Sequence, residues 1–282
     1  MSPKPDTKRL ANFAANVFSQ NGEDGILEKI FELIGVSSKT CIEFGAWDGF
    51  HLSNTANLWT HGWKGILIEG VPERYETLKV NVGQYDCLCI NAFVAREGEH
   101  SLESILERNA AGSEFDLLSI DIDGDDYYIL DSLDRIKPRV IVCEYNPTIP
   151  ATADIYANYG SNFGASVAAL NRLAESKGYM LVALTETNCF FVLNAYSELF
   201  SEYEKRIDFI KSDKQLVYLL TNYSGDYVVY GQPPYGIGTP CRDQLLGDDA
   251  VAPFPRGTGR LLRIRVVRQL KSFAKKALRM RK

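Results

Sequence analysis

The chain has 282 residues, 45% of them hydrophobic and 24% charged, a composition that fits one large globular domain with additions. It holds no run of eighteen apolar residues and no apolar stretch within Met1–Leu10, so the sequence predicts neither a membrane span nor a secretion signal and favours a cytoplasmic protein. Six scattered cysteines without a C-x-x-C pair and only three histidines argue against a disulfide framework or a structural zinc site.

The charge is distributed unevenly along the chain. Of the 31 Lys and Arg residues, eleven lie in residues 251–282, which contain no Asp or Glu. Residues 1–250 therefore hold 20 basic against 36 acidic residues, although the formal net charge of the whole chain is only −5. An acidic body of this kind disfavours a nucleic-acid substrate.

Four segments follow one another in the predicted organisation. Residues 1–17 are expected to form a flexible N-terminal arm and residues 18–194 the main domain. Residues 195–255, rich in Tyr, Gly and charged residues, predict an appended and partly ordered region with a helix near 197–211. Residues 256–282 predict a basic amphipathic helix.

Apolar strands alternate with amphipathic segments through the main domain. A helix is expected from the polar residues 19–24 to Gly35, and the next five apolar runs predict strands at 40–44, 65–69, 87–92, 115–121 and 140–144. The intervening helices are expected from Pro72 and near 126–133 and 165–176. This alternation predicts a parallel, doubly wound sheet.

The last two strands break this alternation. Residues 179–184 and 189–193 are separated by only four residues, a link that requires an antiparallel hairpin. A mostly parallel sheet with a terminal antiparallel hairpin is the strand plan of the class I methyltransferase fold. An all-parallel nicotinamide-binding fold would have a parallel sixth strand instead.

Two glycines follow the first strand where a cofactor loop is expected. Gly45 and Gly49 lack a Cβ and allow close approach of a ligand, and Glu43 ends the strand before them. Glu69, twenty residues after Gly49, ends the next strand where a nucleoside-binding fold keeps the carboxylate that accepts ribose hydroxyls. The pattern predicts an adenosine-containing ligand.

Acidic residues crowd the end of the fourth strand. Asp121, Asp123, Asp125 and Asp126 would repel one another unless a cation, hydrogen bonds or a shared proton relieves them. Asp125 and Asp126 alternatively cap the helix that begins there.

In this order, the motifs resemble the FkbM-like family of S-adenosylmethionine-dependent methyltransferases over residues 18–194. The motifs are Ser19-Gln20 with Gly22-Glu23-Asp24, Glu43-Phe44-Gly45-Ala46-Trp47-Asp48-Gly49, Ile68-Glu69, residues 116–124, Glu144-Tyr145-Asn146, Gly178-Tyr179 and Asn188-Cys189-Phe190-Phe191. Many such enzymes methylate sugar or polyketide oxygens. The family often has Asn before the last loop glycine and Glu-Gly after the fourth strand, where this sequence has Asp48 and Asp123-Gly124.

The resemblance implies a class I, Rossmann-like fold and S-adenosyl-L-methionine as the cofactor. It places Gly45, Ala46 and Gly49 beneath the methionine part and Glu69 on the ribose. Glu43 would order the loop, Asn91 to Phe93 would line the adenine edge, and Asp121 would lie near the cofactor. The cofactor-binding set is therefore Glu43, Gly45, Ala46, Gly49, Glu69, Ala92 and Asp121.

A hydroxyl acceptor must lose its proton during transfer, and two explanations stay open. Mg²⁺ held by Asp123, Glu144 and Asn146 would lower the pKa of the hydroxyl. Without a metal, Asp123, Glu144 or His51 would act as the general base.

The sequence therefore predicts an O-methyltransferase acting on a sugar, glycan-related or secondary-metabolite hydroxyl. The alternatives are a nicotinamide-dependent oxidoreductase and a catalytically silent, membrane-associated protein. The tail suggests peripheral contact with an anionic membrane, at its inner face, or docking on the protein's own acidic body or on a second subunit of a homo-oligomer.

Overall fold

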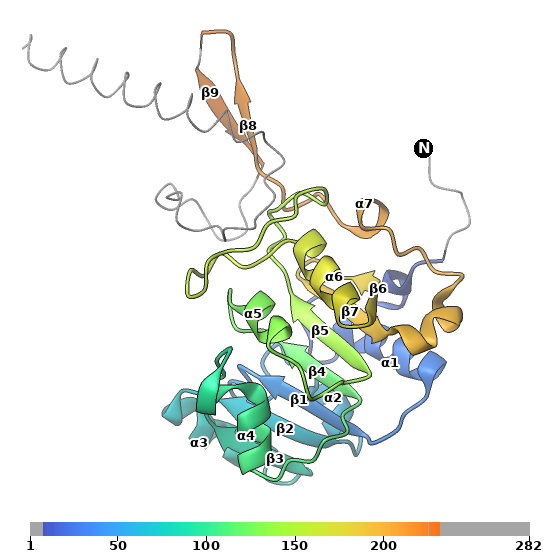
Figure 1. Ribbon diagram of the computed structural model, residues 1–282, viewed down its shortest axis with the longest axis vertical. Helices are drawn as coiled ribbons and strands as arrows, with labels where there is room; N and C mark the ends of the chain where they lie inside the picture. Colours follow the sequence, from blue (N-terminus) through green and yellow to red (C-terminus); the bar gives the residue numbers. More distant parts are fainter. Residues whose placement is uncertain (1–7, 225, 232–282) are drawn as a thin grey trace, which may run out of the picture.

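The computed structural model describes residues 8–224 and 226–231. Its main sheet has the strand order β3-β2-β1-β4-β5-β7-β6 (Figure 1). The strands are β1 (Thr40–Phe44), β2 (Lys64–Glu69), β3 (Cys87–Asn91), β4 (Leu117–Ile120), β5 (Val140–Glu144), β6 (Tyr179–Leu184) and β7 (Asn188–Leu193). Only β7 runs antiparallel to its neighbours β5 and β6. The expected terminal hairpin is therefore present, and the sheet is that of a class I methyltransferase.

This strand direction excludes the all-parallel plan on which the nicotinamide-dependent alternative rested. The strands were predicted closely, and the largest difference is in β4, which is shorter at both ends than residues 115–121.

Helices cover both faces of the sheet, as the near-continuous apolar strands require. The helices are α1 (Glu23–Ile34), α2 (Ala56–Trp59), α3 (Pro72–Val82), α4 (Leu102–Arg108), α5 (Asp126–Asp131) and α6 (Val167–Ser176). One core cluster joins α4, α5 and α6 to strand residues such as Ile42, and the other joins α1, α2 and α3 to alternate strand residues such as Cys41. Successive strand residues thus enter opposite cores.

A buried ion pair fixes the amino-terminal edge of this sheet. Asp116, fully buried before β4, accepts from the Arg139 guanidinium at 2.6 Å and from the backbone N–H of Lys39 at 2.8 Å. Arg139, just before β5, also donates to the carbonyls of Ile34 and Gly35 at the end of α1. The starts of β1, β4 and β5 are therefore held to the end of α1.

The predicted flexible arm is wrong from residue 8 onward. A 3₁₀ helix spans Leu10–Phe13, and Leu10 is buried in the core beside α1. The N–H groups of Val17 and Phe18 both donate to the Asp24 carboxylate at 2.8 Å. Burial of one leucine and these bonds join residues 8–17 to the main domain.

The expected helix at 197–211 is replaced by two short elements. A 3₁₀ helix spans Asn194–Phe200 and α7 spans Ile207–Ile210. The Glu204 carboxylate accepts from the N–H groups of Lys205 and Arg206, which withdraws them from helical bonding. Phe200 is fully buried, so this part packs on the main domain.

Beyond α7, β8 (Tyr218–Thr221) and β9 (Tyr227–Tyr230) form a separate hairpin that projects from the domain (Figure 1). The predicted basic helix at 256–282 lies outside the described residues. Within the described part, no helix is long and apolar enough to cross a membrane. The five described cysteines are free thiols.

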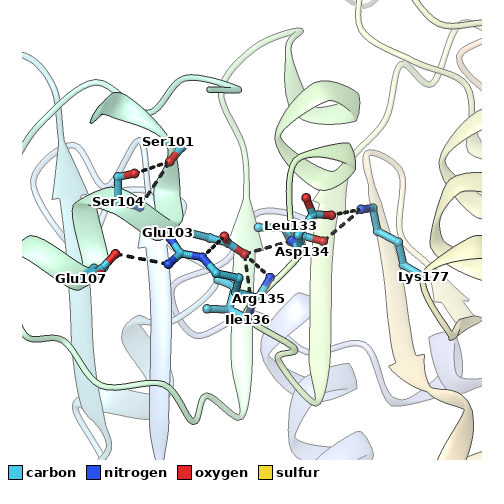
Figure 2. Close-up of polar contacts among 9 residues, drawn as sticks. All are labelled: Ser101, Glu103, Ser104, Glu107, Leu133, Asp134, Arg135, Ile136 and Lys177. Atoms are coloured by element: carbon cyan, nitrogen blue, oxygen red, sulfur yellow. Dashed lines mark hydrogen bonds and ion pairs between the residues drawn. The ribbon is translucent and has the colours of Figure 1, made fainter. Parts of the chain in front are cut away.

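A single carboxylate organises the loop between α5 and β5. Glu103 of α4 accepts from the N–H groups of Asp134 (2.9 Å) and Ile136 (3.1 Å) and from Arg135 through its N–H and its Nε (Figure 2). Burial opposes ionisation of Glu103, but these hydrogen bonds outweigh it and lower its pKa. The Glu107 carboxylate, in the next turn, accepts from the Arg135 guanidinium at 3.3 Å and is exposed.

Glu103→Ala is expected to lower the free energy of unfolding by about 1–3 kcal/mol, because three backbone donors lose a charged acceptor. Since the folded-state pKa of Glu103 is lowered, this contribution is present above the unfolded pKa and is lost as the pH falls through the folded one. Urea denaturation at pH 7 and pH 3 measures both effects. Glu107→Ala is the matched control, with an expected change below about 0.5 kcal/mol; equal losses in the two variants would contradict this assignment.

Candidate functional site

The loop after β1 crosses closely over the neighbouring strand end. Gly45 has a φ of 72°, and a Cβ there would lie 2.6 Å from the carbonyl oxygen of Asp121. Ala46 donates its N–H to Ile68 of β2 at 3.2 Å, and Gly49 donates to Ala46 at 2.7 Å. A tight turn thus lies between the carboxyl ends of β2 and β4, and only glycine fits at position 45.

Glu43 holds the segment that follows this loop. Its buried carboxylate accepts from Ser53 Oγ at 2.6 Å, Thr55 Oγ1 at 2.7 Å and the N–H of Asn54 at 2.9 Å. Burial raises the pKa of Glu43, whereas these three bonds act in the opposite direction. Glu43 therefore fixes the start of α2.

Glu69 lies at the end of β2, next to the same loop. One carboxylate oxygen accepts from the N–H of Trp47 at 2.9 Å and the other from the N–H of Val71 at 2.8 Å. Each oxygen keeps acceptor capacity beyond this bond. Trp47 has a positive φ of 48°, rare for a bulky residue, and Glu69 stabilises that conformation.

The end of β3 lies beside Glu69. Ala92 donates its N–H to the Glu69 carbonyl at 3.2 Å, and Asn91 Nδ2 donates to the same oxygen at 2.8 Å. The Phe93 ring lies against Gly70, where a Cβ would come within 2.3 Å of it, and this ring is largely exposed. The residues expected at an adenine edge thus adjoin the residue expected on the ribose.

Three carboxylates converge after β4 and β5. Ligand atoms of Asp121, Asp123 and Glu144 all lie within 4.8 Å of one another, and we call them the acid triad. Asp123 adopts a φ of 58°, which directs the chain through a sharp turn before Gly124.

Burial and the nearby charges raise the pKa values of two of these carboxyls, Asp121 and Glu144. Loss of solvent, followed by the charge of Asp123, raises the pKa of Asp121 to about 6. Burial and the charge of Asp121 raise that of Glu144 to about 9. A hydrogen bond joins Asp121 and Glu144, so the pair shares a proton at neutral pH.

Asp125 and Asp126 do not cap α5 through side-chain hydrogen bonds, contrary to that expectation. The buried carboxylate of Asp126 accepts from the N–H groups of Ile122 at 3.0 Å and Gly124 at 2.9 Å, and burial raises its pKa to about 7. Asp125 accepts from the N–H of Gly160 at 2.7 Å, in the long loop before α6. Asp126 therefore holds the turn before α5, and Asp125 holds the loop before α6.

Two further predicted site residues, Asn146 and His51, have polar partners outside the acid triad. Asn146 Oδ1 accepts from both the N–H and the Oγ1 of Thr148, and its Nδ2 donates to Phe163. The exposed His51 ring lies 5.4 Å from the Trp47 ring, and its backbone N–H donates to Asp48. The cluster of candidate ligands thus joins Asp121 to two of the predicted metal ligands, Asp123 and Glu144.

Sequence reasoning missed the contribution of α1 to this edge. The buried Glu23 carboxylate accepts from Asn188 Nδ2 at 3.0 Å and from Thr185 Oγ1 at 2.7 Å, which joins α1 to the β6–β7 turn. Asn188 lies directly opposite Glu144 in the β5–β7 pair. Glu23 and Asn188 both stood within motifs of the family resemblance, but no spacing in the sequence signalled their contact.

Residues 95–179 match the family model of the methyltransferase FkbM domain. No curated protein matches the chain. Solved structures with similarity include an O-methyltransferase from Bacillus cereus in complex with SAH (15% identity, 65% of this chain and 85% of that chain, TM-score 0.41). A second is an S-adenosylmethionine-dependent methyltransferase from Clostridium acetobutylicum (9% identity, 61% of this chain and 90% of that chain, TM-score 0.42).

A third is the tRNA (uracil-54, C5)-methyltransferase of Pyrococcus abyssi in complex with S-adenosyl-L-homocysteine, with 18% identity, 63% of this chain, 39% of that chain and a TM-score of 0.35. The chain thus spans well under half the length of that enzyme. The FkbM match covers the acids after β4 and β5, and the sheet has the class I strand order. Residues 95–179 are thus similar to the methyltransferase FkbM domain, and they lie in a sheet with the class I strand order.

Proposed function

We propose that this methyltransferase acts on oxygen, at a hydroxyl of a sugar, glycan-related or secondary-metabolite acceptor. The observation that supports this most is the acid triad, which lies beside the Gly45 turn. Carboxylates suit a hydroxyl acceptor because its proton must leave during transfer.

The cofactor would lie across the ends of β1, β2 and β3. Gly45, Ala46 and Gly49 would pass beneath its methionine part, and the second lone pairs of Glu69 would accept the ribose hydroxyls. Glu43 would act by fixing the segment behind the loop, and Ala92 and Asp121 would border the ligand. When bound, S-adenosylmethionine supplies a sulfonium methyl group.

In the proposed transfer the acceptor oxygen forms a bond to the methyl carbon as the carbon–sulfur bond breaks. The bonding pair stays on sulfur, and the hydroxyl proton passes to a carboxylate. Glu144 already holds a proton at neutral pH because its pKa is about 9, so Asp123 is the better acceptor. Positioning of the hydroxyl by the triad would contribute most of the rate. His51 remains an alternative base.

A divalent cation such as Mg²⁺ fits the donor set of the triad. Three carboxylate oxygens are ligands that hard cations prefer, and a cation would relieve their repulsion. Asn146 fits less well, since its amide oxygen already accepts two bonds from Thr148. We therefore propose Asp121, Asp123 and Glu144 as the ligands; a bound cation would lower the pKa of the acceptor hydroxyl.

Isothermal calorimetry with S-adenosylhomocysteine tests the cofactor assignment. Wild type is expected to bind, and Glu69→Ala to bind about 10–100-fold more weakly because the ribose loses a charged acceptor. Glu73→Ala, on the exposed first turn of α3, is the control and should bind as wild type does. Absence of binding by wild type, or equal affinity of Glu69→Ala, would refute the assignment.

Thermal unfolding with and without millimolar Mg²⁺ at pH 8 tests the cation. The wild-type midpoint is expected to rise, because a ligand of the folded state stabilises it, and Asp123→Asn to respond far less. Asp125→Asn is the matched control, since its amide oxygen can still accept from Gly160. If Mg²⁺ does not change the unfolding midpoint of wild type, the proposed cation site is excluded. The proposed methyl transfer is not affected by that result.

The pH dependence of stability tests the shared proton. The folded-state pKa of Glu144 is about 9, above its unfolded value, so its stabilising contribution is complete at low pH and is lost as the pH rises through about 9. In metal-free buffer at pH 9, the free energy of unfolding of Glu144→Gln, measured by urea denaturation, should therefore exceed that of wild type by at least about 1 kcal/mol. At pH 5 the two free energies should differ little. Glu175→Gln on α6 should follow the wild-type profile. A Glu144→Gln profile as steep as wild type would disprove the shared proton.

A further inference from the structure

Three side chains from separate segments of the chain meet beside the acid triad. Arg96 follows β3, Tyr128 lies in α5 after β4, and Tyr159 lies in the long loop after β5. The Arg96 guanidinium lies 5.4 Å from the centre of the Tyr159 ring and 6.0 Å from that of Tyr128, and the two rings meet edge to face at 5.4 Å. We call these residues the aromatic-arginine platform.

The Arg96 guanidinium is only partly satisfied. Its Nε donates to Glu97 at 3.3 Å, but neither terminal nitrogen bonds to any residue within 8–224 or 226–231. The Glu97 side chain is 77% exposed, so this ion pair is screened by water and contributes little. In the part of the chain that the structure describes, the terminal N–H groups of this guanidinium, which lies against two rings, therefore have no acceptor.

The backbone on either side of Tyr159 is held by hydrogen bonds. Tyr128 Oη donates to the carbonyl of Ala157 at 2.9 Å, and Gly160, the next residue after Tyr159, donates to Asp125 at 2.7 Å. The Tyr159 side chain nevertheless remains 45% exposed. An aromatic ring fixed by its backbone and open to solvent can receive a ligand without losing further conformational entropy.

The platform adjoins the triad through the same loop. A Cβ on Gly124 would lie 2.6 Å from the Cα of Asn162, so the loop that carries Tyr159 packs directly on the turn that carries Asp123. A molecule whose hydroxyl reaches Asp123 can therefore place a neighbouring ring on the platform.

We propose that the aromatic-arginine platform binds a sugar ring of the acceptor that carries an anionic substituent, either a carboxylate or a phosphate. This rests on the proposed O-methylation. The exposed Tyr159 ring provides a flat apolar surface for the sugar, and the free nitrogens of Arg96 match the two oxygens of a carboxylate or phosphate. In a body with excess acidic residues, an anionic acceptor requires such a local cation.

Saturation-transfer NMR titrations of the full chain, with and without S-adenosylhomocysteine, test the platform. The probes are glucuronate, glucose 1-phosphate, glucose and inorganic phosphate. At least one anionic sugar is expected to bind about tenfold or more tightly than glucose, with a preference that falls at high salt. The better of the two anionic sugars identifies the substituent.

Arg96→Met should abolish this preference. Arg96→Lys should retain only part of it, because lysine lacks the paired N–H donors with which a guanidinium binds two oxygens at once. Tyr159→Leu should weaken all sugars, whereas Tyr159→Phe should not. Arg206→Met is the matched control: that guanidinium also lies over a ring, Phe209, at 3.7 Å, but its nitrogens already bind Glu204.

No sugar binding, equal affinity for glucose and both anionic sugars, or an unchanged preference in Arg96→Met would overturn the proposal, as would phosphate binding alone. Failure of the platform and failure of the proposed function are distinguishable. If S-adenosylhomocysteine binds and the sugars do not, only the platform is refuted. If S-adenosylhomocysteine does not bind, the sugar titrations without it still decide the platform.

Discussion

The buried ion pair between Asp116 and Arg139 sets the positions on which the site depends. It joins the amino ends of β1, β4 and β5 and the end of α1 through one carboxylate and one guanidinium. Loss of either partner would leave an uncompensated buried charge, which costs about 3–5 kcal/mol. Because parallel strands have a fixed rise, fixing their starts also fixes the level at which they end. Glu43 and the acid triad lie at that level.

The acids at the carboxyl edge divide into two groups with different partners. Glu43, Glu69 and Asp126 are buried and bind hydroxyls or backbone N–H groups of their own loops. The triad residues lie close to one another, and burial, followed by the charges of neighbouring carboxylates, raises the pKa values of Asp121 and Glu144. The first group holds the loops in place, and the second is the group that we propose takes part in the reaction.

The sheet could be predicted because its signals are local. Strands such as Val140–Glu144 are apolar on both faces, and the four-residue link after Leu184 permits only a hairpin. The close approach at Gly45 could likewise be predicted from the sequence, because a glycine directly follows a buried strand there. The roles of individual acids were not readable. Asp125 and Asp126 looked like helix caps, but their donors come from Gly160 and from the turn before them, and only the folded chain brings these close. The same holds for Glu23 with Asn188, which are 165 residues apart.

The contact between Gly45 and the Asp121 carbonyl bears on how new specificity could be built into this scaffold. A Cβ at residue 45 would lie only 2.6 Å from that carbonyl oxygen, so a methyl group does not fit between the two segments. A graft that exchanged the loops after β4 for those of another enzyme would shift that carbonyl and press on the turn that we propose lies beneath the cofactor. The two segments, residues 43–49 and 119–126, are therefore best transplanted together from the same parent enzyme.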